Sequence, residues 1–154
     1  MHSKHHALVS LVVAAALVVV LPAASVAGRS APAAAVVAYG IALGVFVDLD
    51  HFVIARYRTG SWDAVRFCLS NPTAAVVDQT RIFETGDVGV LSRLLSHLAI
   101  LGVLVPLVAV VDVTLAIVTG VVLYAHVVSD VAWDIRRLPR DVEGATDDVL
   151  RAIR

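Results

Sequence analysis

Val45-Phe46-Val47-Asp48-Leu49-Asp50-His51 closes a long apolar run and introduces three ionisable side chains at its end. Charge beside hydrocarbon is costly, and it persists where it is paired, hydrated or bound to a metal ion. If the apolar run is a membrane helix, the cluster at its end is a functional-site hypothesis. The rest of the chain must then supply the membrane context and the partners of these side chains.

The composition is that of a membrane protein. The chain has 154 residues, of which 59% are hydrophobic and 16% charged, and its mean hydropathy is +0.87; soluble domains are about a quarter charged. The single Cys68 has no partner for an internal disulfide and no neighbouring metal ligand. With a net charge of -1, the chain lacks the excess of basic residues that is typical of nucleic-acid-binding proteins. The expected partner is therefore the lipid bilayer, and no nucleic acid is expected.

Four apolar runs are long enough to cross a hydrocarbon core of about 30 Å. We expect membrane spans over residues 7–27, 33–51, 93–111 and 113–130. For the first run the alternative is a secretory signal peptide, with Ala24-Ser25-Val26-Ala27 as its cleavage site. A turn is expected from Gly28 to Pro32, and Gly40 and Gly44 permit close helix approach in the second run. The predicted fold is an all-α integral membrane protein, a bundle of about four transmembrane helices.

The domain organisation follows from these spans. Residues 1–133 are expected to form one membrane domain, and residues 134–154 a tail with charges of both signs. Residues 52–91 contain no run long enough to span, but Trp62, Val65 and Leu69 recur at helical spacing. This pattern predicts short amphipathic helices at the membrane surface, and the alternative is a solvated connecting loop.

Basic residues indicate the orientation. Four spans place the amino terminus, residues 52–91 and the tail on one side of the membrane. Of the 12 Lys and Arg residues, Arg29 falls on the opposite side, which leaves 11 on the shared side. Positive charge marks the cytoplasmic face, so we expect a plasma-membrane protein with both termini in the cytoplasm.

Histidines and aspartates gather toward the same end of the four spans. Asp48 and His51 are three residues apart, and His126 and Asp130 are four apart, so each pair shares one face of a helix. Imidazole and carboxylate groups together form the donor set of Zn²⁺, Mn²⁺ or Fe²⁺ sites. The predicted metal ligands are His6, Asp48, His51, His97, His126 and Asp130.

Each of these residues also has a simpler explanation. Asp48 and Asp50 can be solvated charges at a helix end, and His97 a hydrogen-bonded core histidine. His126 and Asp130 can be a pair that only stabilises their helix. The joint pattern favours the metal site, because every span contributes to it at one depth.

Four segments together resemble a known family. They are His6, Asp48-Leu49-Asp50-His51, Ser92-Arg93-Leu94-Leu95-Ser96-His97 and Tyr124-Ala125-His126-Val127-Val128-Ser129-Asp130. The chain resembles the membrane-bound metal-dependent hydrolases, the YdjM-like family, which have an early histidine, Asp-x-Asp-His, His-Arg-Gly-x-Thr-His-Ser and His-x-x-x-Asp. The similarity covers the four spans but neither residues 52–91 nor the tail. Ser92 and Leu94 replace a histidine and a glycine of the family, and Val131-Ala132 replaces Thr-Pro.

The resemblance implies a metal-dependent hydrolase with a divalent ion at the cytoplasmic membrane face. Zn²⁺ and Mn²⁺ are the expected ions. Asp50 is the candidate general base, and Arg93 the candidate group that holds a phosphate or carboxylate of the substrate. A site at headgroup level suggests an amphiphilic substrate, such as a lipid or phosphate ester. Because Ser92 replaces a histidine, the alternative is a catalytically degenerate member that binds metal structurally or as an accessory protein. A transporter is disfavoured, because the middle of the spans lacks charge.

Overall fold

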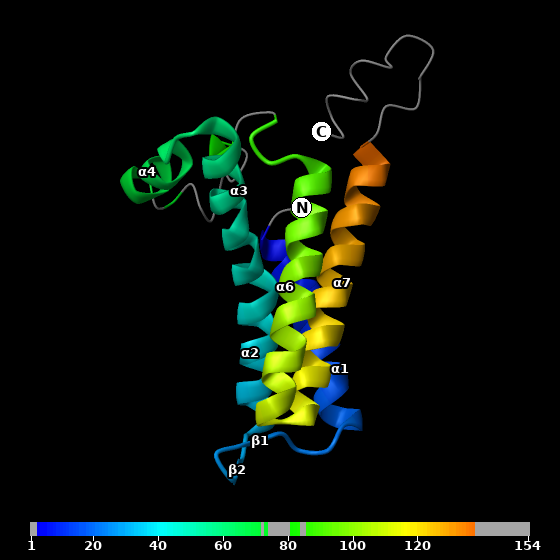
Figure 1. Cartoon of the computed structure of the whole chain (residues 1–154). Helices are drawn as coiled ribbons and strands as arrows, with labels where there is room; N and C mark the ends of the chain where they lie inside the picture. Colours follow the sequence, from blue (N-terminus) through cyan, green and yellow to red (C-terminus); the bar gives the residue numbers. More distant parts are fainter. Residues whose placement is uncertain (1–2, 72, 74–80, 84–85, 138–154) are drawn as a thin grey trace. The chain divides into compact units, whose positions relative to one another are not determined.

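The structure is a computed structural model that describes residues 3–71, 73, 81–83 and 86–137 (Figure 1). Its helices are α1 (Ser3–Val20), α2 (Ala33–Phe46), α3 (Asp50–Thr59), α4 (Asp63–Ser70), α6 (Val90–Val111) and α7 (Val113–Arg137). A short 3-10 helix, η1 (Val47–Leu49), connects α2 to α3, and the strands β1 (Ser25–Val26) and β2 (Arg29–Ser30) form a hairpin. The predicted all-α fold is confirmed.

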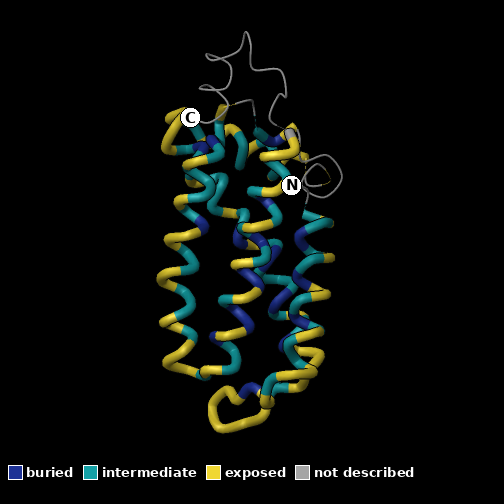
Figure 2. The backbone as a smooth tube through the Cα atoms, turned by 90° about the vertical axis from the view of Figure 1, so that its right-hand side faces the viewer, coloured by how far each residue is buried: buried dark blue, intermediate teal, exposed yellow. Residues whose placement is uncertain are grey.

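Four helical segments are long and apolar enough to cross a membrane. They are Ser3–Val20, Ala33–Thr59, Val90–Val111 and Val113–Arg136. Large apolar side chains cover their outer surfaces, and Val19 and Val110 are more than four-fifths exposed, at 82% and 87%. Figure 2 shows exposed residues along the outer sides of the helices and buried residues on the inner sides. This is the pattern of a protein whose solvent is hydrocarbon, so the prediction of a membrane protein with about four spans is confirmed.

Several helix ends differ from the expected spans: α6 begins at Val90 and α7 ends at Arg137, and two other ends have a local cause. α1 begins at Ser3 and ends at Val20, so residues 21–27 lie outside the helix. Pro22 explains the early end, because proline lacks the N–H group and the ring clashes with the preceding turn. The second segment continues to Thr59 rather than to residue 51, through η1 and α3. It ends at Gly60, whose φ of 76° and N–H bond to the Arg56 carbonyl form a left-handed cap.

The chain divides into two compact units. Unit 1 consists of Met1–Val47 and His97–Ala132, and unit 2 of Asp48–Ser96 and Trp133–Arg154. Unit 1 contains α1, the hairpin, α2 and the larger parts of α6 and α7. Unit 2 contains α3, α4 and the remaining ends of α6 and α7. Of the expected tail, residues 134–137 are the last residues of α7, and residues 138–154 lie outside the described residues.

Unit 1 is an antiparallel helical bundle with a core of small and β-branched side chains. The buried core cluster consists of Ala14, Ala24, Val36, Val118 and Val122. At one end of the bundle, the Ser25 N–H group donates to Asp112 Oδ2 over 3.0 Å. At the other end, His126 on α7 contacts the Gly44 carbonyl on α2. Consecutive helices therefore run in opposite directions.

Two glycines let α1 and α2 approach closely, as the sequence predicted. A Cβ atom at Gly40 would lie 2.7 Å from Ala14 Cβ, and one at Gly44 would overlap the Ser10 hydroxyl. Folded proteins do not contain Cβ contacts this short, so both positions require glycine unless the helices move apart. Ser10 is 1% exposed at this crossing. The close approach brings the start of α1 to the end of α2, which is where the polar residues lie.

The predicted turn is a tight hairpin. Ala27 and Gly28 both have positive φ, 50° and 76°, as a two-residue hairpin turn of the primed type requires.

Asp112 lies between α6 and α7 and accepts a hydrogen bond from the Leu115 N–H group over 2.7 Å. Hydrogen bonds from Leu115 and Ser25 lower the pKa of Asp112. A capping carboxylate thus connects the start of α7 to the hairpin.

Candidate metal centre

A buried polar cluster lies in unit 1. It contains three histidines and one aspartate from three helices, His6 on α1, His97 on α6, and His126 and Asp130 on α7. Their exposed fractions are 1%, 2%, 1% and 4%, in the same order. Burying an unpaired carboxylate among apolar helices costs on the order of several kcal/mol. A cation beside the carboxylate would offset this cost.

All three imidazoles approach the one carboxylate. His6 Nε2 lies 3.2 Å from Asp130 Oδ1, and His126 Nε2 lies 3.4 Å from Asp130 Oδ2. His97 Nδ1 is 3.9 Å from the same Oδ2 atom. The His6 and His126 rings are stacked with centroids 3.9 Å apart, and His97 meets His126 edge to face at 5.0 Å. The carboxylate is therefore the centre of the cluster.

The His126 ring has a defined proton position. Its Nδ1 atom lies 2.9 Å from the Gly44 carbonyl oxygen. A carbonyl oxygen only accepts, so Nδ1 carries the proton and donates it. In the neutral ring this leaves the lone pair on Nε2, the atom that faces Asp130. Histidines that bind metals are commonly oriented in this way by a backbone carbonyl.

The donor set fits a divalent metal ion. His6, His126 and Asp130 each offer one ligand atom, and these atoms lie within 4.8 Å of one another. Two imidazole nitrogens and a carboxylate oxygen, with a third imidazole adjacent, match zinc and manganese chemistry. A cation there would neutralise the buried carboxylate and accept both nitrogen lone pairs. The group can therefore hold a metal ion.

A second polar cluster lies in unit 2, around the motif at the start of α3. His51 Nε2 is 3.5 Å from Asp48 Oδ1 and 3.7 Å from Asp50 Oδ1. The Ser96 hydroxyl donates to Asp50 Oδ2. His51 also meets the Phe83 ring edge to face, with centroids 6.1 Å apart. The motif is therefore an organised, largely buried group rather than a set of solvated charges.

Arg93 has a partner that the sequence analysis did not include. Its guanidinium group pairs with Asp134, and the two side chains are 16% and 21% exposed. Asp134 lies four residues after Asp130, one turn further along α7. That spacing was the available signal, because residues four apart share one face of a helix. Asp134 therefore competes for the group that was expected to hold the substrate.

Four of the six predicted ligands are brought together in unit 1: His6, His97, His126 and Asp130. The other two, Asp48 and His51, lie together in unit 2 with Asp50. That both groups bind one ion stays a prediction. Sequence reasoning missed the carbonyl of Gly44 and the hydroxyl of Ser96, since neither residue type signals a contact by itself.

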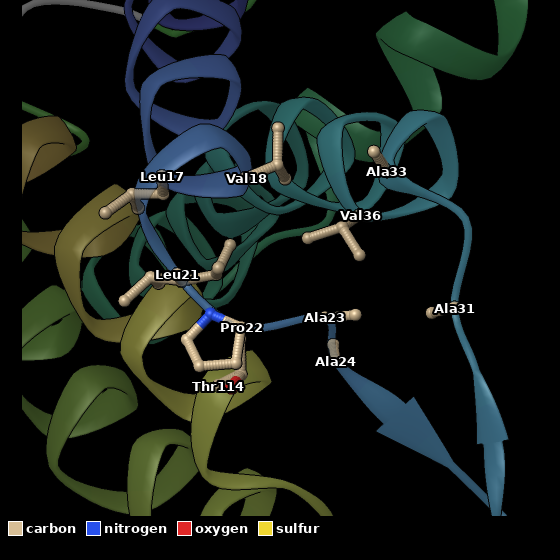
Figure 3. Close-up of a pocket in the computed structure, with 11 residues that line it drawn as sticks. Leu17, Val18, Leu21, Pro22, Ala23, Ala24, Ala31, Ala33, Val36 and Thr114 are labelled. Carbon is tan, nitrogen blue, oxygen red and sulfur yellow. The ribbon is translucent and has the colours of Figure 1, made fainter.

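A cavity at the hairpin end of unit 1 is a weaker candidate site (Figure 3). Its volume is about 110 Å³, below the roughly 300–1,000 Å³ of small-molecule pockets. Among the described residues, its lining is apolar apart from Thr114; Leu17, Leu21 and Pro22 are typical. It lacks the groups that acid, base or metal chemistry needs.

Comparisons of the chain with protein-family models, curated proteins and solved structures find no match. The resemblance to the membrane-bound metal-dependent hydrolases stays a prediction, based on the four quoted motifs.

Proposed function

We propose that the protein is a membrane-bound metal-dependent hydrolase. The observation that carries this proposal is the buried Asp130 carboxylate, which faces the imidazoles of His6, His97 and His126 at 3.2 to 3.9 Å. His6, His126 and Asp130 would hold the ion, and His97 is the adjacent fourth donor. Asp48 and His51 keep their sequence-based role as further ligands.

The chain's own groups have distinct tasks in this proposal. The Gly44 carbonyl holds the Nδ1 proton of His126, so that Nε2 presents its lone pair. Ser96 donates to Asp50 Oδ2 and would orient this carboxylate for a general-base role. A bound Zn²⁺ or Mn²⁺ would lower the pKa of a coordinated water toward neutrality.

The proposed orientation puts this chemistry at the cytoplasmic face of the plasma membrane, because the predicted topology assigns 11 of the 12 basic residues to the side shared by both termini. The substrate would be amphiphilic, a lipid or phosphate ester whose polar group reaches the ends of the helices. Arg93 is the candidate for binding the phosphate of this substrate, which would replace Asp134 as the partner of the guanidinium group.

Metal analysis of detergent-purified protein without a histidine tag tests the proposal. We expect a stoichiometric divalent metal in the wild type and in Tyr39→Phe, which removes only the hydroxyl that bonds Thr119 within the same bundle. We expect its loss in Asp130→Asn. Turnover of short-chain lipid esters and phosphate esters should follow the metal content and stop on chelation. Wild type without metal would refute the proposal.

A second candidate function is a structural or accessory metal-binding membrane protein. The position where the hydrolase family has a histidine holds Ser92, and its Oγ atom accepts a bond from Arg58 Nη1 over 3.4 Å. A hydroxyl that bonds an arginine supplies neither a strong ligand nor a proton-transfer group. Ser92→His separates the two functions: turnover that appears only in the variant assigns the natural protein to the accessory class.

A further inference from the structure

The outer surface of α3 continues the lipid-facing surface of a membrane span. Leu49, Val53 and Tyr57 follow one another at four-residue intervals and are 56%, 62% and 91% exposed. They belong to the candidate span Ala33–Thr59. Side chains four apart lie on one face of a helix, so this stripe ends at a tyrosine. Tyrosine is enriched where hydrocarbon meets water, which places the membrane interface at the end of α3.

The chain turns at Gly60, and α4 follows at this level. Trp62, which directly precedes α4, and Arg66 and Leu69 on α4 are again three or four residues apart and exposed. Trp62 is 45% exposed and Leu69 79%. Large exposed apolar groups on a short helix next to a membrane span are typical of helices that lie in the interface.

The Phe67 side of α4 contacts its own unit. The Arg81 guanidinium group lies 5.8 Å from the centre of the Phe67 ring. In the same segment, Phe83 packs on Phe52 with centroids 5.1 Å apart. These aromatic residues thus serve packing within unit 2. Trp62 also contacts its own unit, since the Arg56 guanidinium lies 5.7 Å from the centre of its ring, but it stays 45% exposed.

The charge on the outer face is basic. Arg66 is exposed and pairs with Asp63 at 3.4 Å, while each side chain keeps 76% of its surface exposed. Arg58, near the end of α3, is exposed as well, although its Nη1 atom donates to Ser92 Oγ over 3.4 Å. An ion pair this exposed contributes at most about 1 kcal/mol, so a phosphate can replace the carboxylate. Two guanidinium groups beside tryptophan, tyrosine and leucine match the chemistry of an anionic lipid surface.

We propose that Tyr57, Arg58, Trp62, Arg66 and Leu69 form an interfacial surface that binds anionic lipid headgroups. Trp62 and Leu69 enter the boundary between headgroups and acyl chains, and the two arginines bind lipid phosphates. The occupant is the bilayer in which the protein resides. This surface is independent of the metal centre, and it stands or falls separately from the proposed hydrolase activity.

Quenching of Trp62 fluorescence by brominated lipids tests the proposal. The chain has two tryptophans, so Trp133→Phe leaves Trp62 as the reporter in the full-length protein. In mixed bilayers we expect brominated phosphatidylglycerol to quench Trp62 at lower mole fraction than brominated phosphatidylcholine. The ratio of their association constants should fall about fivefold in Arg58→Gln or Arg66→Gln. Arg29→Gln, on the hairpin, should leave the ratio unchanged.

A spin label provides a measurement that does not depend on the tryptophan variant. Because Cys68 is the only cysteine, Cys68→Ser with Leu69→Cys places one nitroxide on the outer face of α4. We expect collisions with oxygen to exceed collisions with a water-soluble nickel chelate. A water-exposed label, or a Trp62 that neither lipid quenches, overturns the interfacial placement. Equal quenching by both lipids overturns the binding of anionic headgroups.

Discussion

The Nδ1 atom of His126 lies 2.9 Å from the carbonyl oxygen of Gly44, at the crossing where α2 comes closest to α1. The same glycine therefore has two roles. Its missing side chain leaves room for the Ser10 hydroxyl, and its carbonyl fixes the proton of a candidate metal ligand. Helix packing and imidazole orientation are coupled at this residue.

Gly44→Ala should destabilise the protein and weaken its metal binding together. The new Cβ would overlap the Ser10 hydroxyl, and forcing a methyl group into a packed contact costs about 1–3 kcal/mol. The shift would also move the carbonyl away from His126. Thermal unfolding in detergent and metal titration measure the two effects. Adding Ser10→Gly, which removes the overlapping atoms, should restore part of the stability and part of the metal affinity. If Gly44→Ala alone keeps the wild-type stability and metal affinity, the two helices are not tightly packed at this crossing.

Removing a ligand should weaken metal binding more than removing a group that only orients one. We expect His126→Ala and Asp130→Asn to lose more than the roughly 10–100-fold in affinity typical of outer partners. Competition with a chromophoric chelator measures this affinity. His97→Ala ranks the fourth donor: a loss as large as that of His126→Ala makes it a ligand. If all three variants keep the wild-type affinity, the metal lies elsewhere.

Asp48→Asn tests whether the motif at the end of the second span binds the same ion. The sequence predicts Asp48 to be a ligand, so the variant should lower affinity without changing the stoichiometry. Asp63→Asn, which removes an exposed carboxylate of α4, is the matched control and should bind as the wild type does. A second metal equivalent that Asp48→Asn removes selectively would instead indicate two separate sites.

Stability should decrease in acid because of Asp112. Hydrogen bonds from Leu115 and Ser25 lower the pKa of this carboxyl in the folded state, relative to about 3.9 in an unfolded chain. Asp112 therefore contributes fully to the free energy of unfolding above its pKa in the unfolded chain. This contribution is lost as the pH falls through its pKa in the folded protein. Asp112→Asn should show a smaller drop in melting temperature between neutral and acidic pH. An identical drop in both proteins would contradict the capping role.

Arg93 and Asp134 should show a favourable coupling. Both side chains are more than three-quarters buried, so either single change leaves a charge without its partner in a poorly hydrated place. We expect Arg93→Leu and Asp134→Leu each to destabilise, and the double variant to be more stable than the sum predicts by about 1 kcal/mol. Additive effects would indicate that Arg93 is available to bind substrate.

The sequence determined the membrane class and the number of long apolar spans, because these depend on local properties. An apolar run such as Val113 to Val128 has to be helical in hydrocarbon, where each backbone polar group needs a partner within its own segment. Spacing within one helix also determined which side chains share a face, as for His126 and Asp130. Pro22 and Gly60 lie at helix ends that the span lengths alone did not locate.

The tertiary structure decided which of the polar residues meet. His6 and Asp130 are 124 positions apart in the chain, yet their side-chain atoms lie 3.2 Å apart. That contact depends on how closely α1 packs on α2 at Gly44, and on the rotation of α7. Neither quantity is encoded in any single segment. The sequence thus determined the spans and the candidate donors, whereas packing selected Asp130 as the carboxylate around which three imidazoles gather, because buried charge is tolerated only where several helices bring compensating groups to it.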